Sequence, residues 1–159
     1  MKKIHIFLGR QIHFWLKPFI YFLTNNSNRT RVLINYQNQI LLVKGYISDN
    51  TWGFPGGGVK KSEAIEKGLI REVLEETAIK LDKNMLTFVA KLDSRFLIFK
   101  QNIYLYKVTL KQKPNIHPQK HEISYIRWFK LNELEKYKFS KNNLKYLNIF
   151  YPDLKWNKI

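Results

Sequence analysis

The chain has 159 residues, which fits one domain of ordinary size with room for a hydrophobic core. Lys and Arg number 28 against 12 Asp and Glu, so the formal net charge is +16. This excess predicts an anionic partner, whether nucleic acid, a membrane surface or a phosphorylated substrate, with biased genome composition as the alternative explanation. The absence of cysteine excludes disulfides, zinc–thiolate sites and cysteine nucleophiles.

Residues 1–28 are predicted to form an N-terminal extension. Between residues 4 and 23, apolar and aromatic side chains recur three and four positions apart, which predicts an amphipathic helix that is bent or broken near Pro18. This helix could pack against the domain, form a homodimer interface or lie on an anionic membrane. Because Arg10 and Lys17 interrupt the apolar run, we expect no signal peptide or membrane span, and a cytoplasmic protein.

Residues 29–159 are predicted to form the main domain, which begins with a β-hairpin. Two apolar runs, RTRVLINY and QILLVKGY, flank a short turn at Gln37 and Asn38. Their continuous apolar character predicts strands that are buried on both faces. Arg31 and Lys44, which lie in these runs, are candidate contacts for a phosphate.

A glycine-rich loop at residues 52–58, WGFPGGG, follows the hairpin. Its consecutive glycines allow positive φ and close backbone approach, so Gly57 and Gly58 are candidates to present peptide N–H groups to a phosphate. Trp52 and Phe54 are candidates to stack on a base, although a place in the core is the more common role of such residues.

The helix predicted after this loop carries a cluster of acids, and Ser62 is its candidate N-cap. At about 100° per residue, Glu72, Glu75 and Glu76 share one arc of the helix. Like charges at these spacings repel by about 0.2–0.5 kcal/mol per pair, so the arc needs either full solvation or a bound cation. Oxygen ligands with no Cys or His nearby suit Mg²⁺ or Mn²⁺.

Two strands are predicted after the acidic helix. The runs 85–92 and 96–110 are rich in β-branched and aromatic residues. Asp93 and Ser94 are predicted to form the turn between them.

The C-terminal part is predicted to hold one more strand and a closing helix. The stretch at residues 121–131 combines a loop acid with a strand, and Ser140 is the candidate cap of the helix. Tyr and Trp are interleaved with Lys over residues 136–156, a mixture that is more often an amphipathic terminal helix, with a surface for single-stranded RNA as the alternative.

The stretch from Gly56 to Leu81 resembles the Nudix box. The family pattern is a Gly, five residues, a Glu, seven residues and then Arg-Glu-apolar-x-Glu-Glu-x-Gly-apolar. It aligns with this sequence at Gly57, Glu63, Arg71, Glu72, Val73, Glu75, Glu76, Ala78 and Ile79. Ala78 stands where the family has Gly. We expect the helix to end near Thr77, where Ala in place of Gly costs roughly 1 kcal/mol or alters the exit angle.

The resemblance covers roughly residues 29–155 and implies an α/β fold, an α/β/α sandwich with a mixed sheet. It also implies hydrolysis of a nucleoside diphosphate linked to another group, with Mg²⁺ or Mn²⁺ held by Glu72, Glu75 and Glu76. The implied substrates include a 5′-triphosphate or capped RNA end, a (d)NTP, and ADP-ribose or another nucleotide sugar. A non-catalytic protein that binds RNA or nucleotides is the alternative of a different class.

Four residues receive further roles from the resemblance. In the family, an acid a few positions before a Trp often reaches the metal site from outside the box. Glu122, six positions before Trp128, matches this and is the expected general base, with Glu72 as the substitute and a merely solvated loop acid as the alternative. Arg71 is expected to orient the neighbouring carboxylates, and Glu63 to support the start of the helix.

Overall fold

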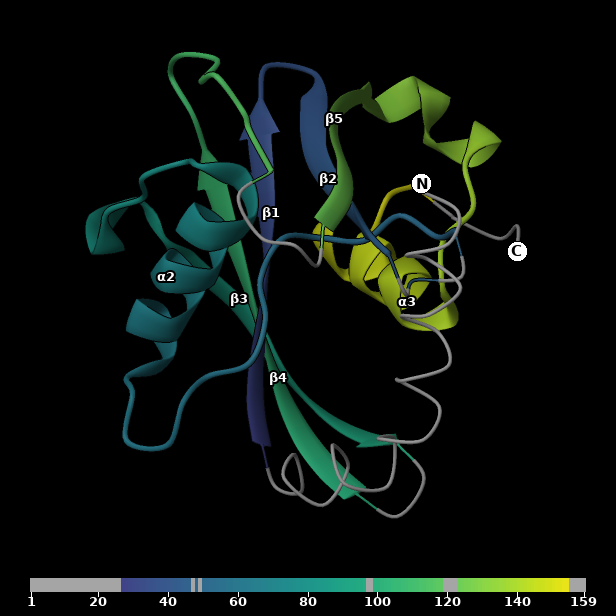
Figure 1. The fold of residues 1–159 in the computed structure, drawn as a ribbon. Coiled ribbons are helices and arrows are strands. Elements are labelled where there is room, and N and C mark those ends of the chain that lie inside the picture. Colours follow the sequence, from purple (N-terminus) through teal and green to yellow (C-terminus); the bar gives the residue numbers. More distant parts are fainter. Residues whose placement is uncertain (1–26, 47, 49, 97–98, 119–122, 155–159) are drawn as a thin grey trace, which may run out of the picture.

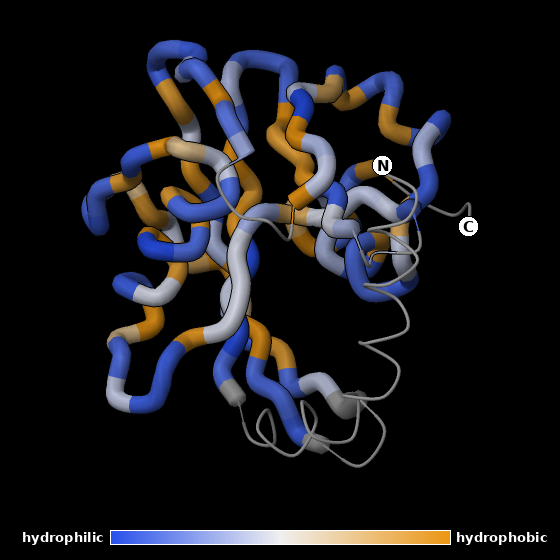
Figure 2. The backbone as a smooth tube through the Cα atoms, in the orientation of Figure 1, coloured by the Kyte–Doolittle hydropathy of each residue, from blue (hydrophilic) through white to orange (hydrophobic). Residues whose placement is uncertain are grey.

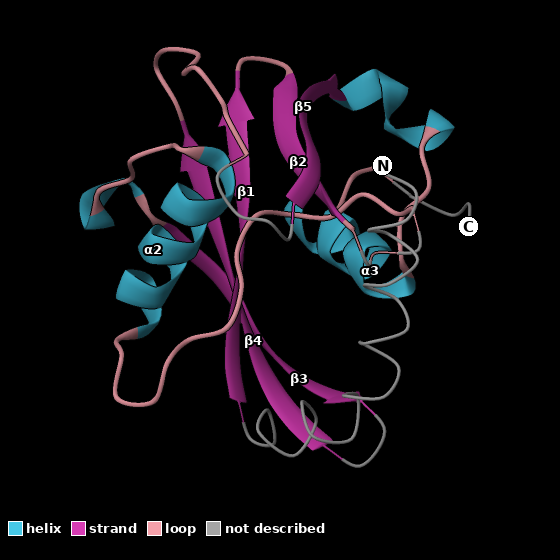
Figure 3. Ribbon diagram, in the orientation of Figure 1, coloured by secondary structure: helices cyan, strands magenta, loops and turns pink. Residues whose placement is uncertain are grey.

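The computed structural model describes residues 27–46, 48, 50–96, 99–118 and 123–154. Its centre is one five-stranded sheet in the order β3-β4-β1-β2-β5, drawn in Figures 1 and 3. The strands are β1 (Ser27–Tyr36), β2 (Gln39–Gly45), β3 (Thr87–Phe96), β4 (Phe99–Thr109) and β5 (Ile123–Lys130). The helices are α2 (Ile65–Thr77) and α3 (Lys141–Phe150), with short 3-10 turns at η1 (Lys83–Met85) and η2 (Leu131–Lys136).

The sheet is mixed, as predicted. β1 runs parallel to β4, whereas the pairs β1–β2, β2–β5 and β3–β4 are antiparallel. The hairpin turn falls at Gln37 and Asn38, between β1 and β2, which confirms the first predicted turn.

Alternate residues of β1 belong to different layers of the protein. Val32 and Ile34 join a cluster with α2 residues such as Leu69 and Val73, while Leu33 joins a cluster with α3 residues such as Leu144 and Leu147. This follows from the two-residue period of a strand. The helices therefore cover opposite faces of the sheet (Figure 1), and hydrophobic residues colour its central strands in Figure 2. The predicted sandwich and the two-sided burial are confirmed.

The glycine-rich loop fills the gap where β1 and β2 diverge. β1 and β2 pair next to their turn, and farther along the segment 53–58 lies between them. Val32 N donates to Pro55 O at 3.0 Å, while Val43 and Gly53 exchange two backbone hydrogen bonds of 2.9 Å each. The loop is thus held by both strands and lies at the centre of the sheet.

The predicted turn at Asp93 and Ser94 is wrong. Both residues lie inside β3, where they pair with Asn102 and Gln101 of β4. Local turn propensity favoured a break there, but the long antiparallel ladder supplies a partner for this stretch, and tertiary context overrides such propensities.

Two expectations fall on residues outside the described part of the chain. These are the amphipathic helix at residues 4–23, with its packing, dimer or membrane alternatives, and the loop acid Glu122. Among the described residues, neither helix has the length and apolar character needed to cross a membrane.

Candidate active site

The start of α2 is held by a network of side chains. The predicted cap Ser62 is wrong: the N-cap is Ala64, without a side-chain hydrogen bond, and Ser62 adopts a left-handed φ of 68°. Glu63 instead accepts hydrogen bonds from Lys60 N at 2.9 Å and from Arg71 Nε and Nη2 at 3.0 and 2.9 Å. The paired donors of Arg71 and the Lys60 N–H lower the pKa of Glu63 from 4.5 to about 2.

Arg71 connects this network to the acidic arc. Its Nη1 donates to Glu72 Oε1 at 2.6 Å and lies 3.6 Å from Glu75 Oε1, and its Nη2 donates to Gly58 O at 3.0 Å. The hydrogen bonds to Glu63 and then Glu72 raise the pKa of Arg71, so the guanidinium stays charged. The expected contacts between Arg71 and the neighbouring carboxylates are present.

Glu72 approaches the glycine-rich loop closely and is 7% exposed. A Cβ at Gly57 would overlap the Glu72 carboxylate, whereas a Cβ at Gly58 would meet no atom within 4 Å. Gly57 therefore leaves the space that the end of the Glu72 side chain occupies, whereas no atom crowds Gly58. Their predicted N–H contacts to a phosphate stay predictions.

Glu76, which is 8% exposed, is hydrogen-bonded to the same loop at Gly56, the residue before Gly57. Gly56 N donates to Glu76 Oε2 at 2.8 Å. The carbonyl oxygen of Gly56 is bonded as well: Arg31 Nη1 donates to Gly56 O at 2.5 Å and to Thr30 O at 2.9 Å. Gly56 has a φ of 121°, and a Cβ there would lie 2.5 Å from Thr30 O, so this conformation requires glycine. Arg31 thus braces the loop that positions Glu76.

The end of α2 confirms the expected geometry. The helix ends at Thr77, and Ala78 adopts the left-handed conformation with φ 63° while its N–H donates to Leu74 O at 2.9 Å. Thr77 Oγ1 donates to Val73 O and accepts from Ile79 N. These hydrogen bonds support a position that Gly usually fills.

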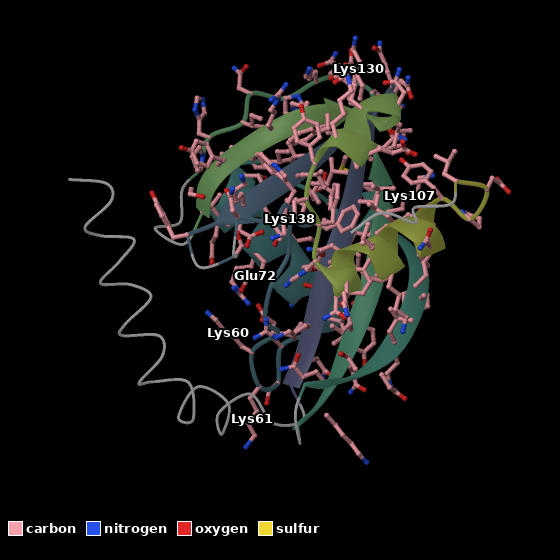
Figure 4. The ribbon with its side chains drawn as sticks, turned by 90° about the vertical axis from the view of Figure 1, so that its right-hand side faces the viewer. Lys60, Lys61, Glu72, Lys107, Lys130 and Lys138 are labelled. Atoms are coloured by element: carbon pink, nitrogen blue, oxygen red, sulfur yellow. The ribbon has the colours of Figure 1, made fainter. Side chains whose placement is uncertain are left out.

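A cavity of about 200 Å³ opens beside Glu76 and the loop. It is lined by groups from both layers, including Arg31, Ser48, Thr51, Gly53, Phe54, Gly56, Glu76, Ile123 and Asn143. The two buried carboxylates and the cavity therefore share the loop at residues 53–58. Figure 4 shows Glu72 inside the molecule, with Lys60 and Lys61 on the outer part of the loop that leads into α2.

The residues predicted to contact a base or a phosphate lie in different environments. Phe54 is 2% exposed and packs edge-on against Phe150 at 5.1 Å, so its ring belongs to the core and cannot stack on a base. Trp52 is half-buried against Phe129. Lys44 Nζ lies over the Trp52 ring at 4.7 Å and donates to Asn50 Oδ1 at 2.8 Å, next to the cavity but outside its lining.

Known proteins resemble this chain in sequence and in fold. The model of the NUDIX domain family matches residues 26–148. This chain belongs to the NUDIX family. Two relatives are the mRNA decapping complex subunit 2 of Schizosaccharomyces pombe, 34% identical over 108 residues, and the RNA pyrophosphohydrolase of Actinobacillus succinogenes, 31% identical over 70 residues. These matches cover 65% and 44% of this chain but only 14% and 35% of the relatives.

Solved structures superpose on this chain with low sequence identity. The NUDIX domain of Shewanella oneidensis NrtR, complexed with ADP ribose, has a TM-score of 0.67 at 16% identity and covers 79% of this chain and 86% of that one. A bifunctional NMN adenylyltransferase/ADP ribose pyrophosphatase from Francisella tularensis has a TM-score of 0.71 at 17% identity, covering 91% and 47%. At such identities the likeness establishes the fold.

The Nudix box offers oxygen ligands for a divalent cation. Within the described ranges, no three His, Cys, Asp or Glu side chains are gathered into a ready metal-binding group. The donor chemistry nevertheless fits Mg²⁺ or Mn²⁺, because Glu72 and Glu76 place two buried carboxylates one helical turn apart and Glu75 lies beside them. Glu122, the fourth candidate, lies outside the described residues.

Asn143 is a cavity residue that sequence reasoning missed. It lies on α3, whose predicted cap is confirmed because Asn143 N donates to Ser140 Oγ. Its side-chain amide donates to Trp52 O at 3.0 Å across 91 residues of sequence. A polar residue in the first turn of an amphipathic helix carries no signal of such a contact, so only the fold identifies it.

Proposed function

We propose that this chain hydrolyses a diphosphate bond in a nucleoside diphosphate linked to another group. The observation that carries the proposal is the meeting of two buried carboxylates, Glu72 and Glu76, with the glycine-rich loop beside a cavity. Buried acids are costly unless they are paired or coordinate a cation, so their placement here favours a site for chemistry.

The carboxylates of Glu72, Glu75 and Glu76 would hold Mg²⁺ or Mn²⁺. The cation would neutralise the diphosphate and acidify a bound water. Arg71 keeps Glu72 and Glu75 oriented through its Nη1, and Glu63 holds Arg71 from the other side. Because its pKa is about 2, Glu63 remains an anion across the whole physiological range.

Proton removal is assigned to Glu122, with Glu72 as the substitute. One oxygen of Glu72 already accepts a 2.6 Å hydrogen bond from Arg71, which engages it in holding the site together. This engagement favours a different carboxylate for proton removal, and Glu122 is the acid that the Nudix resemblance assigns to this task. In the sequence, Glu122 comes directly before Ile123, which lines the cavity.

The proposed substrate is a 5′-triphosphate or capped RNA end. The net charge of +16 complements a polyanion, and relatives named for RNA pyrophosphohydrolase and mRNA decapping support this choice. Free nucleotides are the second candidate, because the 8-oxo-dGTP diphosphatase of Buchnera aphidicola is 44% identical over 43 residues.

Activity on a panel of diphosphates with Mg²⁺ or Mn²⁺ tests the proposal. Glu76→Gln should lower kcat by about 10²-fold or more, because it removes a charge that the mechanism requires. Glu135→Gln, at an exposed position of η2, is the matched control. No hydrolysis of any substrate, or an unchanged rate in Glu76→Gln, would reject the proposal in favour of a non-catalytic binding protein.

Substrate choice is tested by comparing triphosphate RNA with a free NTP at two salt concentrations. Contacts to several phosphates make nucleic-acid binding fall steeply with salt. We expect kcat/KM to fall more with salt on the RNA than on the NTP. An equal fall on both would favour free nucleotides.

A further inference from the structure

A strip of cations and aromatic rings lies on the α3 side of the sheet beside the cavity. This β5 strip consists of Lys44, Trp52, Tyr125, Arg127 and Tyr137. Lys44 and Tyr125 are paired across β2 and β5. Trp52 and Tyr137 pack against the same hydrophobic cluster as α3, which places the strip on that face.

The cations of the strip are stacked on its rings. Lys44 Nζ lies 4.7 Å from the centroid of Trp52 and 5.8 Å from that of Tyr125. Arg127 Cζ lies 6.0 Å from the centroid of Tyr137 and is also stacked on the buried Phe129 at 5.1 Å. Such contacts hold a cation over a ring while leaving it open to a second partner.

The outer side of the strip is open to solvent and positively charged. Tyr125 is 62% exposed, the largest exposed fraction among the exposed large hydrophobic side chains of the described residues, and Arg127 is exposed as well. The two strands that carry the strip, QILLVKG and ISYIRWFK, contribute Lys44 and Arg127 to its face and contain no acid. The nearest following acids, Glu133 and Glu135, belong to η2.

The strip is continuous with the cavity. Gly45 and Ile123 line the cavity and form the register pair next to Lys44 and Tyr125. On the other side, Thr51 and Gly53 line the cavity and flank Trp52. A polymeric substrate whose end reacts in the cavity would therefore reach the strip directly outside the cavity.

Resting on the proposed function, we propose that the β5 strip binds the nucleotides that follow the reacting 5′ end of a single-stranded RNA. Exposed rings and stacked guanidinium groups accept bases of any sequence, and the cations attract the phosphates. The strip would thus select RNA over free nucleotides by length and not by sequence.

The spacing of the strip favours a single strand. Tyr125 and Arg127 are two residues apart on one strand, about 6.6 Å. This is roughly twice the 3.4 Å rise per nucleotide along one strand of a duplex. Neighbouring bases that stack on Tyr125 and Arg127 would have to move apart from each other, and bases held in a duplex cannot do so.

Hydrolysis of 5′-triphosphorylated RNAs, from the NTP through the dinucleotide to the octanucleotide, tests the strip in the full chain. For the wild type, kcat/KM should rise with length over the first few nucleotides and then level off. The double variant Tyr125→Ala/Arg127→Ala should lower the ratio of kcat/KM on octanucleotide to that on NTP by about tenfold, because it removes stacking.

Lys130→Ala is the matched control. Lys130 is an exposed cation of the same strand, but the alternation of β5 places it on the other face, and it lies at the end of the strand in Figure 4. This control should keep the length dependence. If Lys130→Ala lowers the ratio as much as the double variant, or if the double variant keeps it, the strip is not the binding site.

Binding of a 5′-hydroxyl octanucleotide, measured by fluorescence anisotropy, separates this inference from the proposed hydrolysis. About tenfold weaker binding by the double variant, with unchanged binding by Lys130→Ala, would support the strip even if no diphosphate is hydrolysed. Equal competition by poly-glutamate or by duplex RNA would show a general polyanion surface and overturn the proposal.

Discussion

The two ends of α2 are held by different means. At its start, where no side chain caps the helix, Glu63 reaches two turns forward to Arg71, which in turn bonds back to Gly58 of the loop. At its end, Ala78 and Thr77 bond to the preceding turn and to Ile79, and one backbone hydrogen bond reaches farther, from His117 N to Thr77 O at 3.2 Å. The start therefore depends on side chains that reach the glycine-rich loop, while the end is held by short-range hydrogen bonds and one backbone contact to His117, away from the loop. Changes near the loop should disturb the carboxylates far more than changes at the end.

Gly57→Ala should have the largest effect, because its Cβ overlaps the Glu72 carboxylate. The crowded atoms are the end of the Glu72 side chain, so the carboxylate should be displaced, which should lower kcat and cost about 1 kcal/mol of unfolding free energy, the lower end of overpacking effects. Gly58→Ala, with no atom within 4 Å of its Cβ, should stay within about 0.5 kcal/mol. Urea unfolding of both variants measures the difference. Equal losses at the two positions would contradict the close packing of Glu72.

Glu63→Gln should have a smaller, pH-dependent effect on the start of the helix. The pKa of Glu63 falls from 4.5 to about 2 on folding, so the carboxylate stabilises the protein above pH 4.5, and this contribution is lost as the pH falls toward 2. The wild type should exceed the variant in stability at pH 6, and the gap should narrow by pH 2. Denaturant unfolding across this range tests it, and a gap that does not change with pH would show that Glu63 is not the titrating partner of Arg71.

Ala78→Gly should have the smallest effect and the opposite sign. Gly adopts a φ of 63° without the penalty that Ala carries, although it also loses more entropy on folding. A gain in unfolding free energy below about 1 kcal/mol is expected, with an unchanged rate of hydrolysis. A large change in activity would show that the end of α2 also positions the carboxylates, and would remove the contrast between the two ends.

Regular periodicity predicted much of the fold. The turn at Gln37 and Asn38, the end of α2 at Thr77 and the Ser140 cap are all confirmed, because each is specified by neighbouring residues. The turn at Asp93 failed because β4, a partner elsewhere in the chain, overrode its local preference. Ser62 failed because it lies in a tight turn, closed by Glu63 N and Lys60 O, two residues before the N-cap Ala64. The roles assigned to the individual acids remain predictions that the variants above can test.

The sequence by itself determined that three carboxylates share one arc of a helix after a glycine-rich loop, because helical period and glycine's conformational freedom are local properties. Only the tertiary structure decided which acids are buried against the loop, through contacts such as Gly56 with Glu76, 20 residues apart. It also brought Asn143 to Trp52 and assembled the β5 strip from separate strands. These features depend on how distant segments pack together, and no local pattern in the sequence predicts them.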